Sequence, residues 1–263
     1  MVEFNIMWTD VVDLNDFYGS SLGQTARRII RRRARAMWPN VQGMVVAGMG
    51  YATPFLRPFR DEAERVIAVM PAGQGVLHWP TGEPGLVVLS DEDELPLPDL
   101  SVDRLLLVHV VESSEQLRAM MREAWRVLSD SGRLLIVVPN RRGIWARLDR
   151  TPFGFGHPYS RGQLSRLLRE CMFTPFQSAR ALYMPPIDWK VMLTSAFAIE
   201  KIGSRWFPTF AGVLMIEAGK QIYAVTPSKS VNRRERRFVV LPGRAPAARV
   251  SPIRDGLRLL TDD

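Results

Sequence analysis

Cysteine, histidine and long apolar runs are scarce in this chain of 263 residues. Cys171 is the only cysteine, which excludes an intrachain disulfide and a metal site built from cysteines. The three histidines, His78, His109 and His157, are scattered, so we expect no metal centre. No apolar run reaches the roughly 18 residues that a membrane span needs. The first ten residues lack the basic-then-apolar order of a secretory signal, and we expect a cytoplasmic location.

Basic side chains are in excess, and they are clustered. The net charge is +8, and six arginines fall between Arg27 and Arg35. Arg141 and Arg142 form a pair, and the last 36 residues hold nine basic and four acidic side chains. Such clusters attract nucleic acid, anionic lipid or an acidic protein surface, but they are also typical of a solvated face. The charge alone leaves both interpretations open.

Apolar residues recur with a pattern that alternates between helix and strand. Helices are expected at 21–38, 55–64, 113–128 and 160–172, and in an insertion at about 187–206. Strands are expected at 43–47, 65–70, 85–89, 104–108, 133–138, 181–184 and 212–225, and a polar turn at 16–21. The strands are apolar throughout, which favours a doubly wound, mostly parallel sheet with helices on both faces. The fold class is therefore α/β and Rossmann-like.

Three segments carry a family resemblance. A loop and buried strand, Leu95–Glu112, precede a helix, a glycine turn and another buried strand that end at Pro139. Upstream, the segment 45–52 reads Val-Val-Ala-Gly-Met-Gly-Tyr-Ala. The combination resembles class I S-adenosylmethionine-dependent methyltransferases of the type 11, small-molecule kind, over about residues 40–175. The resemblance implies a seven-stranded sheet whose last strand is antiparallel. It divides the chain into an arginine-rich helical cap (1–40), a methyltransferase-like domain (41–226) and a basic, disordered tail (227–263).

The same resemblance implies a cofactor site for S-adenosylmethionine. The residues at its positions are Gly48, Met49, Gly50, Tyr51, Met70, Gln74, Asp91, Glu92, His109 and Val110. The sequence departs from the family pattern where Val46 and Met70 replace carboxylates and Ala52 replaces a third glycine. A carboxylate that accepts both ribose hydroxyls contributes on the order of 1–3 kcal/mol, or roughly 5- to 150-fold in affinity. Gln74 is the expected substitute.

A dinucleotide site is a weaker interpretation of the glycine turn. The Rossmann fingerprint needs a third glycine and an acid near the end of the second strand. Ala52 and Met70 stand at these positions, so NAD is disfavoured at least as strongly as S-adenosylmethionine.

Substrate would lie over the carboxyl ends of the strands. We expect the contacts to come from Asn140, Arg141, Arg142, His157 and Tyr159. The arginine pair either binds a carboxylate or phosphate of the substrate or is simply exposed to solvent. Methyl transfer is an in-line displacement that depends mainly on positioning. A base is needed only if the acceptor loses a proton, and the candidates are His109, His157 and Tyr159.

Three functions remain open at this point. The leading one is S-adenosylmethionine-dependent methyl transfer to a small or medium-sized acceptor. The alternative is a methyltransferase-like, non-catalytic protein that acts through protein partners, with contacts through the N-terminal helix or the 187–206 insertion. The third is an RNA methyltransferase or RNA-binding protein, which the basic clusters suggest.

Overall fold

The computed structural model describes residues 10–221, so the expected tail at 227–263 lies outside the described residues. The helices are α1 Val11–Gly19, α2 Ser21–Met37, α3 Thr53–Leu56, α4 Leu117–Val127, α5 Arg161–Glu170, α6 Lys190–Thr194 and α7 Ala196–Trp206. Short 3-10 turns are η1 Arg57–Phe59, η2 Trp145–Arg147, η3 Pro152–Gly154 and η4 Pro208–Phe210. The strands are β1 Val45–Gly50, β2 Arg65–Pro71, β3 Val87–Ser90, β4 Val102–Val108, β5 Leu128–Pro139, β6 Phe173–Ala181 and β7 Val213–Lys220.

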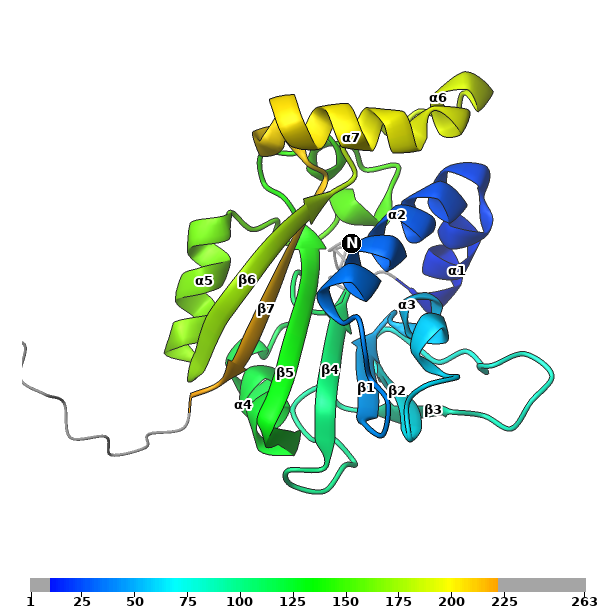
Figure 1. Cartoon of the computed structure of the whole chain (residues 1–263). Helices are drawn as coiled ribbons and strands as arrows, with labels where there is room; N and C mark the ends of the chain where they lie inside the picture. Colours follow the sequence, from blue (N-terminus) through cyan, green and yellow to red (C-terminus); the bar gives the residue numbers. More distant parts are fainter. Residues whose placement is uncertain (1–9, 222–263) are drawn as a thin grey trace, which may run out of the picture. The chain divides into compact units, whose positions relative to one another are not determined.

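The strands form one seven-stranded sheet in the order β3-β2-β1-β4-β5-β7-β6 (Figure 1). Neighbouring strands are parallel from β3 to β5, whereas β7 runs antiparallel to both β5 and β6. This confirms the expected α/β class and the antiparallel last strand. Strand order reverses between β1 and β4, and in open α/β sheets ligands bind outside the carboxyl ends of the strands at such a point.

Both faces of the sheet are covered, as the uniformly apolar strands require. Val46 and Leu106 point into a core shared with α1, α2 and α3, whereas Met49 and Leu107 point into a core shared with α4 and α5. Alternate strand residues face opposite sides, so the two cores come from interleaved positions. Within residues 10–221, no helix is long and apolar enough to cross a bilayer.

Three elements differ from the expectation. The helix expected at 55–64 is shorter, because α3 and the 3-10 turn η1 end at Phe59. Residues 16–21 do not form a single turn, because α1 extends through Gly19 and only Ser20 separates it from α2. The sixth strand is Phe173–Ala181 rather than 181–184. It contains Pro175, which has no backbone amide to donate. Because β6 is the edge strand and its register shifts beside Pro175, no hydrogen bond between central strands is lost.

Candidate cofactor cleft and an arginine-lined cavity

The expected cofactor cleft lies where the carboxyl ends of β1, β2 and β4 meet. Gly50 ends β1 with a φ of +78°, a conformation that glycine adopts without strain. An added Cβ at Gly50 would lie 2.2 Å from the carbonyl oxygen of Val108, and one at Gly48 would lie 2.6 Å from Cβ of Ala52. Both glycines are therefore needed for the packing of the chain itself.

A buried hydrogen-bonded chain crosses this cleft. The Tyr18 hydroxyl lies 2.7 Å from Nε2 of His109, and Nδ1 of His109 lies 3.0 Å from Oε1 of Glu112. A carboxylate only accepts, so Nδ1 donates to Glu112, and Nε2 of the neutral ring then accepts from Tyr18. The Tyr18 ring also stacks on Tyr51, with centroids 5.5 Å apart. Burial, with smaller contributions from Tyr51 and Glu112, raises the pKa of Tyr18 well above its usual value.

Helix α1 is held over the cleft by a second contact. The backbone amide of Val11 donates to the carbonyl oxygen of Gln74 at 2.8 Å, and the Gln74 side-chain amide donates to the carbonyl oxygen of His109 at 3.1 Å. Oε1 of Gln74 and Oε2 of Glu112 are buried acceptors that have no donor within residues 10–221. The cleft thus holds two acceptors suited to a ligand that carries hydroxyl or amino groups.

The other expected cofactor residues have varied surroundings. Asp91 is exposed just beyond the end of β3, while Glu92 is buried and accepts from Ser114 and from the amide of Gln116 at the start of α4. The sulfur of Met70 accepts from the amide of Leu77. Met49 and Val110 are fully buried in the core on the α4 side of the sheet.

These observations test whether S-adenosylmethionine fits. Gln74, Glu112 and the exposed Asp91 supply acceptors for ribose and amino donors. Val46 and Met70 are buried and apolar where family carboxylates stand. The Tyr18 ring lies between Tyr51 and His109, directly over the glycine turn. The residues therefore match the cofactor in hydrogen-bonding chemistry, but they leave it room only if α1 moves.

The expected substrate residues are only partly brought together. Tyr159 is half-buried, its hydroxyl donates to the carbonyl of Val111 at 3.5 Å, and burial followed by Glu112 raises its pKa. The backbone amide of His157 donates to the carbonyl of Glu112, but its ring is exposed. The side-chain amide of Asn140 donates to the carbonyls of Thr209 and Ala211, whereas Arg141 and Arg142 are exposed.

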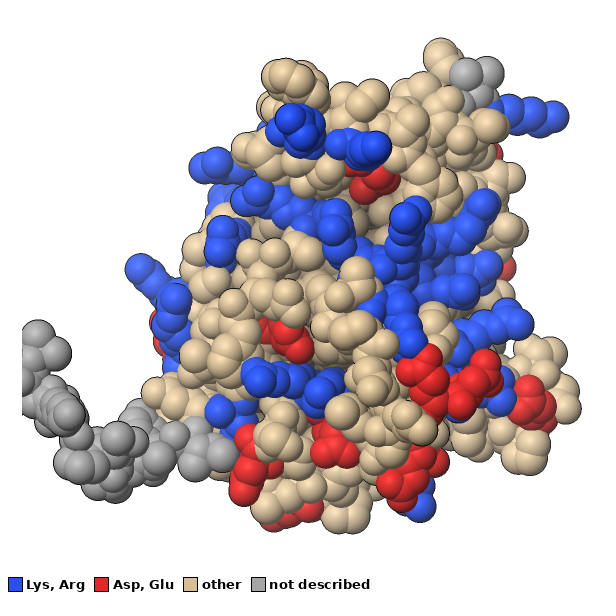
Figure 2. Space-filling view, viewed as in Figure 1, with Lys and Arg blue, Asp and Glu red and all other residues tan. Residues whose placement is uncertain are grey.

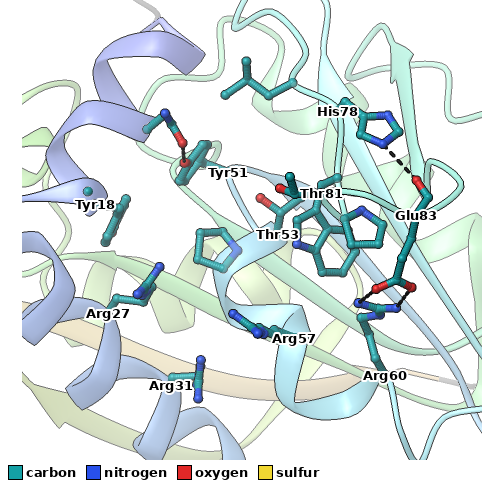
Figure 3. A pocket seen from close by; sticks show the side chains of 16 residues that line it. Tyr18, Arg27, Arg31, Tyr51, Thr53, Arg57, Arg60, His78, Thr81 and Glu83 are labelled. Atoms are coloured by element: carbon teal, nitrogen blue, oxygen red, sulfur yellow. Dashed lines mark hydrogen bonds and ion pairs between the residues drawn. The ribbon is translucent and has the colours of Figure 1, made fainter.

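A cavity of about 650 Å³ adjoins the cleft on the side of α2 (Figure 3). Its wall includes Arg27 and Arg31 from α2, Arg57 from η1 and the rings of Tyr51 and Trp79. Of this cavity wall, the sequence indicates only the arginine-rich helix α2. The i, i+4 spacing of Arg27 and Arg31 places both on one side of α2, but the contribution of Arg57 depends on the tertiary structure. Figure 2 shows basic side chains gathered in this part of the molecule.

Part of the chain matches a known family in sequence. The model of a methyltransferase domain family, Methyltransf_11, matches residues 45–136, from β1 into β5. No curated protein matches the chain in sequence.

Solved structures of low sequence identity share the fold. A SAM-dependent methyltransferase from Archaeoglobus fulgidus is 20% identical, with a TM-score of 0.56 over 78% of this chain and 96% of that one. One from Thermotoga maritima is 15% identical, with a TM-score of 0.55 over 81% and 96%. The [4+2]-cyclase SpnF is 21% identical, with a TM-score of 0.52 over 76% and 82%. One fold thus hosts more than one chemistry. Residues 45–136 are thus similar to a methyltransferase domain family, and the described sheet has the fold of S-adenosylmethionine-dependent methyltransferases.

Proposed function

We propose that this protein transfers a methyl group from S-adenosylmethionine to a small or medium-sized acceptor. The observation that carries the proposal is the family match across residues 45–136, which includes every strand end of the expected cofactor cleft. Two buried, unpartnered acceptors in that cleft, Gln74 Oε1 and Glu112 Oε2, support it. The single cysteine supports a cytoplasmic location as a further part of the proposal.

Helix α1 acts in this proposal as a lid. It has nine residues, and its inward side chains are Val11, Leu14 and Tyr18. Three hydrogen bonds fasten it over the strand ends: from Val11 to Gln74, from Tyr51 to Asn15, and between Tyr18 and His109. A short helix with few attachments opens at a lower free-energy cost than the sheet beneath it. Opening removes the Tyr18 ring from the glycine turn and gives the cofactor room.

The residues of the cleft then have separate roles. Gln74 and Glu112 accept hydrogen bonds from the cofactor, and Asp91 accepts from its adenine amino group. The bound cofactor supplies a methyl group on a positively charged sulfur. His109 exchanges its bond with Tyr18 for a bond with the acceptor and removes a proton from it, while Glu112 holds the other ring nitrogen. The acceptor lies beside His157 and Tyr159, with Asn140, Arg141 and Arg142 at the margin.

Calorimetric titration with S-adenosylmethionine and S-adenosylhomocysteine tests the proposal. We expect measurable binding by the wild-type chain, tighter binding by Tyr18→Ala because the closing contacts are gone, and about fivefold weaker binding by Asp91→Asn. Glu94→Gln, in the same exposed turn, is the matched control and should bind like the wild type. The proposal is contradicted if neither the wild type nor Tyr18→Ala binds either ligand at near-millimolar concentration.

A second candidate is a non-catalytic methyltransferase-like protein that acts through a protein partner. The seated Tyr18 and the apolar Val46 and Met70 favour it, because all three oppose cofactor binding. Large apolar side chains are also exposed around α6 and α7, as is typical of interaction surfaces: Trp189, Phe197, Ile202, Trp206, Phe207 and Phe210. Failure of the titration, together with a partner retained by the wild type but lost by Trp206→Ser, would establish this candidate.

A further inference from the structure

The cavity beside the cleft has walls from four segments, and the first of them is α1, which contributes Asn15 and Tyr18. Helix α2 contributes Arg27 and Arg31, and the stretch of α3 and η1 contributes Thr53 and Arg57. The loop after β2 contributes further side chains, including Trp79 and Thr81. Figure 3 shows Arg27, Arg31 and Arg57 converging on the same hollow from two elements. Its volume of about 650 Å³ is within the range of small-molecule sites.

The positive charge in this cavity is not balanced. Arg60 pairs with Glu83 at 2.5 Å and lies over the Trp79 ring, so it is already satisfied. Arg27, Arg31 and Arg57 form no ion pair within residues 10–221, and Nε of Arg27 is buried without an acceptor there. Burial, followed by repulsion from Arg27 and Arg57, lowers the pKa of Arg31. Arg27 and Arg31 are half-buried and Arg57 is exposed, and their convergence on one cavity indicates a site for an anion.

We propose that this cavity binds a phosphorylated small molecule with at least two negative charges. Guanidinium groups donate paired hydrogen bonds that match phosphate oxygens, and Thr53 and Thr81 add hydroxyl donors. Tyr51 and Trp79 give the ligand an aromatic wall beside the phosphates, so a nucleotide-like ring suits the remaining space. A bound anion offsets the repulsion among the three arginines.

A small molecule suits the site better than a nucleic-acid backbone does. Arg27, Arg31 and Arg57 point into a hollow, whereas the phosphates of a polymer need charges displayed along an open surface. Arg28, Arg32 and Arg33 of the same helix are exposed and do not line this cavity. Gln74, Asp91 and His109 lie outside the cavity, whereas Tyr18 and Tyr51 line it, so the site adjoins the expected cofactor site and is tested without S-adenosylmethionine.

Calorimetric titration without S-adenosylmethionine tests the proposal, with inorganic pyrophosphate and adenosine diphosphate as probes at low salt. Arg31→Gln and Arg57→Gln should each weaken binding at least tenfold, because each removes a charge-assisted bond. Arg28→Gln removes the same charge from an exposed position on α2 and should change affinity less than twofold. Adenosine diphosphate should bind more tightly than pyrophosphate if its ring uses the aromatic wall.

The melting temperature separates loss of the site from loss of the fold. Arg31→Gln should keep or raise the melting temperature of the ligand-free protein, because it removes repulsion, and should abolish the rise that pyrophosphate causes. Three results would overturn the proposal. In the first, neither probe binds at about 10 mM. In the second, Arg28→Gln weakens binding as much as Arg31→Gln and Arg57→Gln do. In the third, short single-stranded RNA binds more tightly than the two probes and its binding depends equally on Arg31 and Arg57.

Discussion

Among single residues, Tyr18 has the most consequences for this fold. Its hydroxyl joins α1 to His109, which lies 91 residues further along the chain, and its ring stacks on Tyr51. The bond is buried, so water does not replace it if it is lost while α1 stays in place. Stability and the proposed opening of α1 therefore involve the same side chain.

Replacing Tyr18 with phenylalanine tests this bond. We expect Tyr18→Phe to lower the free energy of unfolding by about 1–2 kcal/mol, because Nε2 of His109 loses its buried partner. Urea denaturation at pH 7 measures the change. Tyr183→Phe is the matched control, since the Tyr183 hydroxyl has no hydrogen bond within residues 10–221, and its effect should stay within about 0.5 kcal/mol. Equal effects of the two substitutions would show that the Tyr18–His109 bond contributes nothing specific.

Among the elements, helix α4 is fastened to the loop before β4 by one arginine. Arg126 donates to the carbonyls of Leu95 and Leu97 and to the carboxylates of Asp99 and Glu123. Glu123 in turn accepts from the amide of Leu95. This network fixes a proline-containing loop that has no regular structure of its own.

Removing the arginine should loosen that loop. We expect Arg126→Ala to lower the free energy of unfolding by about 1–3 kcal/mol, because charge-assisted bonds to two backbone carbonyls are lost. Hydrogen exchange should also accelerate at Leu95 and Leu97. Arg122→Ala, on the exposed side of the same helix, is the control and should leave both measurements nearly unchanged. Unaltered exchange in Arg126→Ala would rule out the fastening role.

The same network predicts a pH dependence. Hydrogen bonds from Arg126 lower the pKa of Glu123 in the folded protein, so its ionised form is favoured on folding. Its contribution to stability is present above the ordinary glutamate pKa and is lost as the pH falls through the lowered value. Urea midpoints between pH 7 and pH 3 should therefore fall less steeply in Glu123→Gln than in the wild type. A steeper fall in the variant would contradict the assignment.

For the molecule as a whole, the N-terminal helices share the core of the sheet. Ile30 of α2 and Leu135 of β5 belong to one buried cluster, together with side chains of β1 and β4. The sequence predicts an N-terminal cap over residues 1–40, and Ile30 of that segment packs in the core of the sheet. A shared core favours one cooperative unfolding transition for the cap and the sheet.

Core substitutions on either side of that boundary test this cooperativity. Ile30→Ala and Leu135→Ala should each lower the free energy of unfolding by about 2–5 kcal/mol. Each should shift one transition, with the same midpoint by circular dichroism and tryptophan fluorescence. A separate early transition that only Ile30→Ala displaces would show that the cap unfolds independently.

The sequence predicted the sheet more completely than the site. Apolar runs such as Leu105–Val108 identify buried strands because burial on both faces requires apolar side chains at every position. Helix α1 was missed because Asn15, Asp16 and Gly19 have low helix propensity, and only its contacts with the cleft stabilise it. Strand β6 was misplaced because Pro175 and its polar neighbours are typical of an edge, where local pattern is weak.

Local periodicity in the sequence is enough to predict the α/β class and the apolar faces of the strands, and short motifs are enough for residues 45–136 to match a methyltransferase domain model. The contact of Tyr18 with His109 and the meeting of Arg57 with Arg27 and Arg31 around one cavity, in contrast, are visible only in the folded chain. Those groups come from segments distant in the chain. Their meeting depends on how the helices pack against the sheet, which no local pattern encodes.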